Sequence, residues 1–113
     1  MGTAEVATAD VRDYGQVAAV AELALERFGR IDVLVANAGI ADQSRADKLD
    51  PDRSKAVVET NLLGTVYAVR AVLPWMLERG SGHIFVTASV SGREAYPGEP
   101  VYIAGTPSFE PAA

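Results

Sequence analysis

The sequence predicts an α/β fold built on a parallel sheet, for three reasons. Short, apolar, β-branched runs at 31–36 and 84–88 are typical of strands buried inside a sheet. Longer segments around them, at 13–28 and 51–79, carry apolar residues at helical spacing. The two kinds of segment alternate without a repeat, which is the pattern of an α/β domain.

Composition and charge narrow the class of protein. The chain has 113 residues, of which 49% are apolar and 22% charged, as in one globular domain at most. Its net charge of -5 is mixed along the chain and forms no basic face, so we expect neither nucleic acid nor membrane as a partner. The absence of cysteine excludes disulfides and thiolate metal sites, and we expect no metal and a cytoplasmic location. We see no export or lipidation signal near the N-terminus.

The first part of the chain predicts a short strand and then a helix. The strand is expected around Glu5 to Ala9. Asp13 with Gln16 three residues later resembles a capping box that opens the helix, and Gly29 would end it. One apolar face of the helix would lie on the sheet, formed by Val17, Val20, Ala21, Ala24 and Phe28.

A second strand–helix–strand unit follows. Ile31 to Ala36 is apolar on both sides after its second residue, which predicts a parallel strand buried on both faces. Asp50 and Pro51 are a helix N-cap and first residue, and Gly80 would end the long helix. Pro74 should bend that helix or mark its last turns. The helix carries apolar residues at spacings of four and three, namely Leu62, Val66, Val69, Leu73 and Met76.

The next strand leads into a loop of small residues. The strand, Ile84 to Ala88, is followed by Ser89 to Gly92, which would lie at the carboxyl edge of the sheet, where open parallel sheets bind ligands. His83 begins the strand beside a glycine turn, so we expect it at the surface. Residues 105–113 contain no helix or strand pattern, and we expect a disordered tail there.

Four features recur in a characteristic order. A strand ends in Asn37-Ala38-Gly39, Asn61 lies inside a helix, Ser89 follows the next strand, and Tyr102 comes thirteen residues later. In this order and spacing the sequence resembles the short-chain dehydrogenase/reductase family. The resemblance runs from about Glu5 to Ala104, which is less than half of a typical member.

The resemblance implies a fold and an activity. Residues 1–104 would be part of a Rossmann-type, doubly wound parallel sheet, containing the family's strands three to five with their helices. The family uses NAD or NADP to interconvert alcohol and carbonyl groups in small-molecule substrates by hydride transfer. Neither the choice between NAD and NADP nor the substrate is assigned by these residues.

The resemblance also implies a cofactor site. Asp10 would contact the adenine ring, with Val11 packed nearby; alternatively, Asp10 is a second carboxylate that caps the following helix. Asn37, Ala38 and Gly39 would let the backbone pass close to the cofactor and would brace the central sheet.

The catalytic residues implied by the resemblance are Asn61, Ser89 and Tyr102. Asn61 would hold a water that relays protons, although a polar residue in a helix can simply be solvated. Ser89 would bind the substrate oxygen, and Tyr102 would exchange the proton while hydride moves to or from nicotinamide. Ser91 and Tyr96 are nearby competitors, but neither gives the thirteen-residue interval.

Two departures from the family pattern lead us to expect no turnover from this chain alone. Thr106 stands where the family has the lysine that favours the tyrosinate, and without that cation only about one phenol in a thousand is ionised at pH 7. No glycine-rich turn for a pyrophosphate is present. In the family's strand order, two strands would separate Glu5–Ala9 from Ile31–Ala36 by roughly 14 Å, leaving the first strand unpaired and an apolar edge open.

Other interpretations stay open at this stage. One is a non-catalytic interaction fragment whose helix from Leu62 to Met76 pairs with a full-length relative or forms a homo-oligomer. Another is a generic α/β binding domain, which leaves the Asn, Ser and Tyr spacing as coincidence. The departures also suggest, as a hypothesis, a misassigned start and a frame change after Ala104. The hypothesis would be disproved if the flanking DNA held neither a glycine-rich coding sequence upstream nor a lysine-containing frame downstream.

Overall fold

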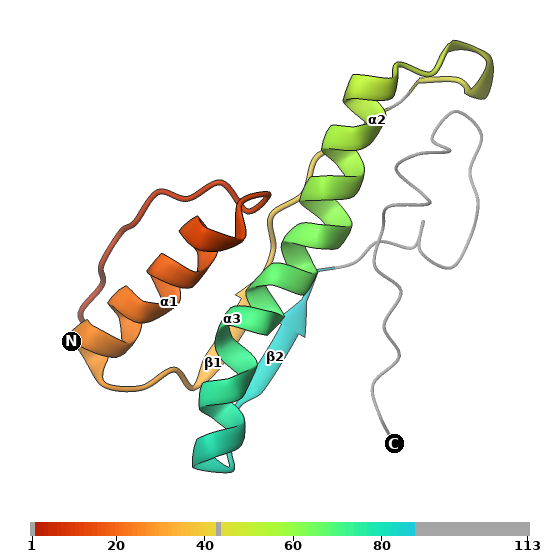
Figure 1. Ribbon diagram of the computed structural model, residues 1–113. Helices are drawn as coiled ribbons and strands as arrows, with labels where there is room; N and C mark the ends of the chain where they lie inside the picture. The colour runs from red at the N-terminus through yellow and green to blue at the C-terminus, as the bar shows by residue number, and fades with distance from the viewer. Residues whose placement is uncertain (1, 43, 88–113) are drawn as a thin grey trace.

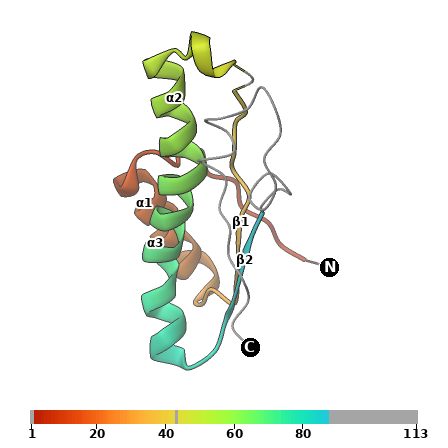
Figure 2. The same cartoon turned by 90° about the vertical axis from the view of Figure 1, so that its right-hand side faces the viewer.

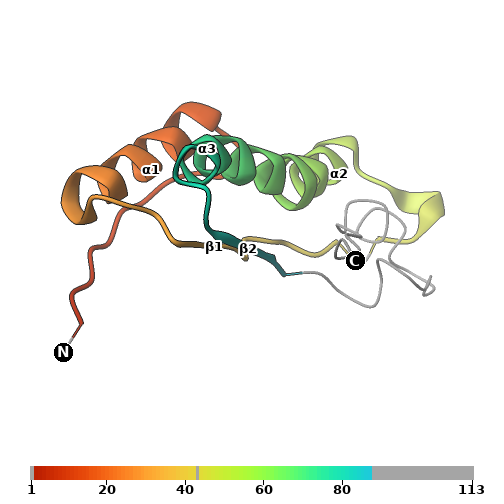
Figure 3. The ribbon, with the colours of Figure 1, turned by 90° about the horizontal axis from the view of Figure 1, so that it is seen from below.

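The computed structural model describes residues 2–42 and 44–87. Two parallel strands, β1 and β2, lie side by side, with Val33 opposite His83 and Ala36 opposite Val86. The helices lie on one face of this sheet (Figures 1, 2 and 3). In chain order the elements are α1 (Tyr14–Phe28), β1 (Val33–Ala36), a 3-10 turn (Ala46–Lys48), α2 (Pro51–Val58), a π-turn (Glu59–Leu63), α3 (Gly64–Arg79) and β2 (His83–Val86). The predicted α/β fold is confirmed.

Local capping explains the bounds of α1. The carboxylate of Asp13 accepts two hydrogen bonds from Gln16, one from its backbone N–H at 3.3 Å and one from its side-chain Nε2 at 3.2 Å. At the other end Gly29 adopts φ 79°, a left-handed conformation that favours glycine, and its N–H bonds to the Leu25 carbonyl at 2.8 Å. The predicted helix start and end are both confirmed.

A long helical run crosses the molecule from Pro51 to Arg79 and joins α2, the π-turn and α3 (Figure 1). Asp50 caps it by accepting the Asp52 N–H at 2.9 Å, and Gly80 ends it with φ 75°. Pro74 is accommodated within the last turns. The run is long and apolar enough to cross a membrane on length and composition, but a core helix meets the same criterion. Here one face of α3 packs against α1 and β1.

The core lies between the helices and the inner face of the sheet. Its buried centre consists of Ala21 from α1 and Ala71, Val72 and Met76 from α3. Partly buried side chains complete it from α1, from the segment before β1 and from the two strands, namely Val17, Ile31, Leu34 and Ile84. The apolar face predicted for α1 is confirmed in part: Val17 and Ala21 belong to the core, whereas Val20 and Phe28 are exposed.

The prediction that the strands are buried on both faces is wrong, because the outer face of the sheet is exposed. Val33, Val35 and Phe85 are 51%, 61% and 57% exposed. Burial alternates along both strands because the helices cover only one face. His83 lies on the exposed face, as predicted, with its ring stacked near Phe85.

The prediction of a strand at Glu5 to Ala9 was wrong. The structure shows no strand there, and Val6 is 92% exposed. A single strand has no partner for its backbone N–H and C=O groups, and no neighbouring strand lies beside this segment in the described residues.

Candidate functional site

The side chain of Asn61 fastens the loop after β1 to the long helix. Its Oδ1 accepts the Ile40 N–H at 2.8 Å, and its Nδ2 donates to the Ile40 carbonyl at 2.8 Å. Asn61 is only 6% exposed. It is therefore a buried amide that bonds at both its oxygen and its nitrogen, rather than a solvated residue, which removes one of the two sequence-based interpretations.

Asn61 owes its place to the π-turn. There the Gly64 N–H bonds to the Glu59 carbonyl, five residues back, instead of the four of an α-helix. Because the turn contains one extra residue, the side chains after it are rotated about the helix axis relative to those before it. Such turns occur often at functional sites.

A cavity of about 210 Å³ lies at the carboxyl end of β1. Three residues of the predicted cofactor site, Val11, Asn37 and Ala38, line it. Gly64 and Thr65 line it from the helix, and neither was singled out from the sequence. The fold thus brings together residues from the loop before α1, the end of β1 and the start of α3.

Gly64 permits the close approach of the Val11 loop to the helix. A Cβ added at Gly64 would lie 3.0 Å from Val11 Cγ2, tighter than most contacts between carbon atoms. Gly39, in contrast, would bring a Cβ no closer than 3.5 Å to Asn61 Oδ1, an ordinary contact. The packing within this chain therefore requires glycine at Gly64 rather than at Gly39.

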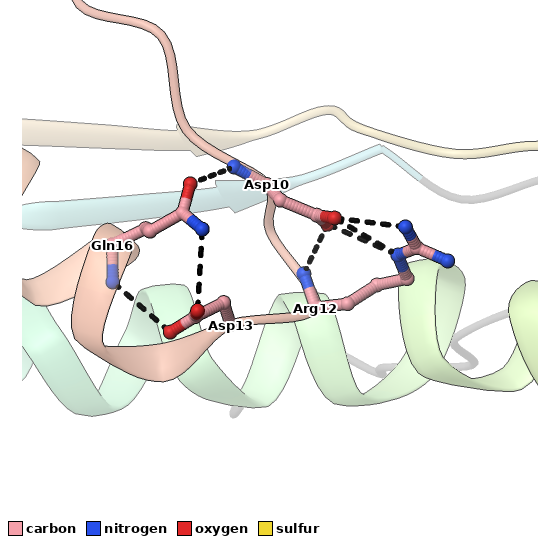
Figure 4. A network of polar contacts seen from close by, with 4 residues as sticks. All are labelled: Asp10, Arg12, Asp13 and Gln16. Atoms are coloured by element: carbon pink, nitrogen blue, oxygen red, sulfur yellow. Dashed lines mark hydrogen bonds and ion pairs between the residues drawn. The ribbon is translucent and has the colours of Figure 1, made fainter.

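Asp10 organises the turn that leads into α1 (Figure 4). Its carboxylate accepts the Arg12 backbone N–H at 2.9 Å and the guanidinium Nη2 at 2.8 Å, while its own N–H donates to Gln16 Oε1 at 2.9 Å. The hydrogen bonds from Arg12 lower the pKa of Asp10 from 3.8 to about 2. The helix cap is Asp13, so the alternative of Asp10 as a second cap is wrong.

Thr87 ties the ends of the two strands together. Its N–H donates to the Ala36 carbonyl at 3.0 Å, and its hydroxyl donates to Asn37 Oδ1 at 2.7 Å. Ser89, the predicted substrate-binding residue, comes two positions later. Ser89 and Tyr102 lie outside the described residues, as do the competitors Ser91 and Tyr96, the position of the missing lysine and the predicted tail.

The loop after β1 also contains a buried carboxylate. Asp42 is 3% exposed and accepts hydrogen bonds from the Ser44 N–H and hydroxyl, which lower its pKa. Its other oxygen, Oδ2, meets no donor in the part of the chain that the structure describes. Across residues 2–42 and 44–87, no three acidic or histidine side chains gather as metal ligands would.

Known proteins match this chain over nearly its whole length. The pattern of the short chain dehydrogenase family matches residues 1–105. The oxidoreductase BOA17 of Botryotinia fuckeliana is 44% identical over 82% of this chain and 34% of its own length. Human 17-beta-hydroxysteroid dehydrogenase type 1 is 41% identical over 96% of this chain and 33% of its own length. The chain spans about a third of the length of these relatives.

Solved structures show the same arrangement. The gluconate 5-dehydrogenase of Burkholderia cenocepacia, in complex with NADP and tartrate, superposes with a TM-score of 0.82 at 36% identity, over 86% of this chain and 38% of that protein. Levodione reductase superposes with a TM-score of 0.83 at 39% identity, over 86% and 38%.

The contact between Gly64 and Val11 predicts that the two positions are energetically coupled. We expect Gly64→Ala to lower the free energy of unfolding by about 1 kcal/mol, because overpacking outweighs the better helix propensity of alanine. In a Val11→Ala background the contact with Cγ2 is gone and only those with Cβ, at 3.3 Å, and the carbonyl oxygen remain, so the same change should cost clearly less. Urea unfolding of the four proteins measures the coupling. An equal loss in both backgrounds would show that the two residues do not crowd each other.

The ion pair of Asp10 predicts a pH dependence. Because the folded pKa lies near 2, below its ordinary 3.8, the stabilisation is fully present above about pH 5 and is lost as pH falls through the folded pKa. The difference in unfolding free energy between wild type and Asp10→Asn should shrink over that range. Carboxyl NMR titration should place the pKa of Asp10 near 2, and Arg12→Met should raise it only part of the way to 3.8, because the backbone N–H of residue 12 still donates to the carboxylate. Titration near 3.8 in the wild type would contradict the pairing.

Proposed function

This chain belongs to the short-chain dehydrogenase family, and we propose on that basis that it is part of an NAD- or NADP-dependent oxidoreductase that interconverts alcohol and carbonyl groups in a small molecule. The observation that carries the proposal is the buried Asn61, fixed to Ile40 and bonded to Thr65, which lines a cavity together with Val11, Asn37 and Ala38. The whole protein's activity is part of the proposal, because the chain spans about a third of its curated relatives.

The proposed chemistry assigns one task to each residue. Ser89 donates a hydrogen bond to the substrate oxygen and holds it beside Tyr102. Tyr102 gives a proton to that oxygen during reduction and takes it back during oxidation. The carbonyl of Asn61 holds the water that returns the proton to solvent. A bound nicotinamide cofactor supplies or accepts the hydride.

The residues present fit one part of such a cofactor. Val11 and Ala38 give the cavity an apolar lining and Asn37 adds a polar group, which suits a flat heteroaromatic ring such as adenine. The sequence holds no glycine-rich turn for the pyrophosphate, and Thr106 takes the place of the catalytic lysine. We therefore propose that these 113 residues alone give no turnover. The proposed location is the cytoplasm.

A chimera tests the catalytic assignment. Residues 5–104 of this chain replace the matching segment of levodione reductase, so that the host supplies the glycine-rich turn and the lysine after Tyr102. We expect turnover of the host's substrate with NADH or NADPH. Tyr102→Phe should lower kcat by about 10²- to 10⁴-fold, since it removes the acid–base group, and Ser89→Ala should also lower kcat strongly.

Matched controls separate these roles from general damage. Tyr96→Phe and Ser91→Ala make the same chemical changes nearby and should leave kcat within about twofold of the parent chimera. A folded, active chimera whose turnover survives Tyr102→Phe would refute the proposed mechanism. Turnover that depends on Tyr96 instead would reassign the acid.

A second candidate, a non-catalytic pairing surface, is favoured by one observation. Large apolar side chains are exposed along the long helix: Leu62 by 38%, Val66 by 48%, Trp75 by 44% and Leu77 by 70%. Leu62 and Val66 are one helical turn apart, so they form part of one stripe. The predicted homo-oligomer through Leu62 to Met76 would cover this stripe.

Sedimentation of the chain tests this pairing. We expect a dimer whose dissociation constant rises at least about tenfold in Leu62→Glu/Val66→Glu, because the charges would be buried without partners. Val6→Glu introduces a charge at a residue that is 92% exposed and should leave the dimer unchanged. A wild-type monomer at all concentrations would exclude the pairing function.

A further inference from the structure

Thr65 makes a hydrogen bond to Asn61 that has no role in the chemistry proposed above. Its hydroxyl donates a hydrogen bond to the Asn61 carbonyl oxygen at 3.0 Å. Both residues are only 6% exposed, so the bond is shielded from solvent. Thr65 also lines the cavity at the end of β1.

The bond acts on the residue that fastens the loop after β1. Both ends of the Asn61 side-chain amide bond to Ile40, and the backbone carbonyl oxygen of Asn61 is the atom that accepts the bond from Thr65. The π-turn interrupts the regular four-residue hydrogen bonding here, as the bond from Gly64 to Glu59 shows. The Thr65 hydroxyl places a donor four residues after Asn61, at the spacing at which an α-helix would offer a backbone N–H.

We propose that Thr65 is a positioning residue: its hydroxyl holds the Asn61 carbonyl in the π-turn and so keeps the Asn61 side chain aligned with Ile40. Replacing that bond with a regular helical turn would rotate Asn61 away from the loop. A carbonyl oxygen has two acceptor sites, so a bond from Thr65 is compatible with a relay water on the same atom. The importance of Thr65 for catalysis rests on the proposed function, whereas its effect on Asn61 does not.

Threonine hydroxyls bond to carbonyls in many ordinary helices, so the hydroxyl and the methyl group of Thr65 must be tested separately. Thr65→Val keeps the shape and removes the donor. Thr65→Ser keeps the donor and removes the methyl group. A positioning role of the hydroxyl predicts damage from valine and rescue by serine, whereas a packing role predicts the reverse.

Amide hydrogen exchange of the 113-residue chain, followed by NMR, supplies the readout. The Ile40 N–H should exchange about tenfold faster in Thr65→Val, which corresponds to the loss of one buried hydrogen bond. In Thr65→Ser its rate should stay within about twofold of wild type. The Gly29 N–H, bonded to Leu25 at the far end of α1, serves as the internal control and should not change.

Three results would overturn the inference: an unchanged Ile40 rate in Thr65→Val, equal acceleration in the serine variant, or equal acceleration of Gly29 and Ile40. If Thr65→Val does not fold, Thr65→Cys, with a weaker donor, is measured against the same criteria. The readout needs neither cofactor nor turnover. An inactive chimera would therefore count against the proposed function while leaving the role of Thr65 to be decided by these rates.

Discussion

The paired hydrogen bonds between the Asn61 side chain and the Ile40 backbone are the constraint on which the site depends. They join two segments 21 residues apart and satisfy an N–H and a C=O in a partly buried loop. Leaving either group without a partner would cost about 1–3 kcal/mol. Asn61 lies within the π-turn, Glu59–Leu63. The first residues of the loop, Asn37 and Ala38, line the cavity at the end of β1.

Around that contact the fold is a two-stranded sheet with helices on one face only. The two parallel strands bring their carboxyl ends together, where Thr87 binds both Ala36 and Asn37. Helices α1 and α3 cover only the inner face, so the core is small and rich in alanine and valine. The outer face of the sheet and the long helix expose large apolar side chains. Large exposed apolar surfaces are typical of protein–protein interaction sites.

Features that depend on neighbouring residues were predictable from the sequence. The caps at Asp13, Gly29 and Asp50 act within a few residues, and all three formed as expected. The segment from Glu5 to Ala9 has the local pattern of a strand but forms none, because no strand lies beside it among the described residues, as the family's strand order led us to expect. Asn61 was predicted in a helix, but its partner is distant in sequence, and no pattern marked the π-turn. The need for glycine at position 64 likewise comes from a tertiary contact with Val11.

The most direct measurement of the central contact is the scalar coupling across the hydrogen bond between the Ile40 amide nitrogen and the Asn61 side-chain carbonyl carbon, in isotope-labelled chain. A partly buried bond of 2.8 Å predicts an observable coupling together with an Ile40 N–H that exchanges slowly. Absence of the coupling, with Ile40 exchanging as fast as an unprotected amide in an otherwise folded chain, would contradict the account.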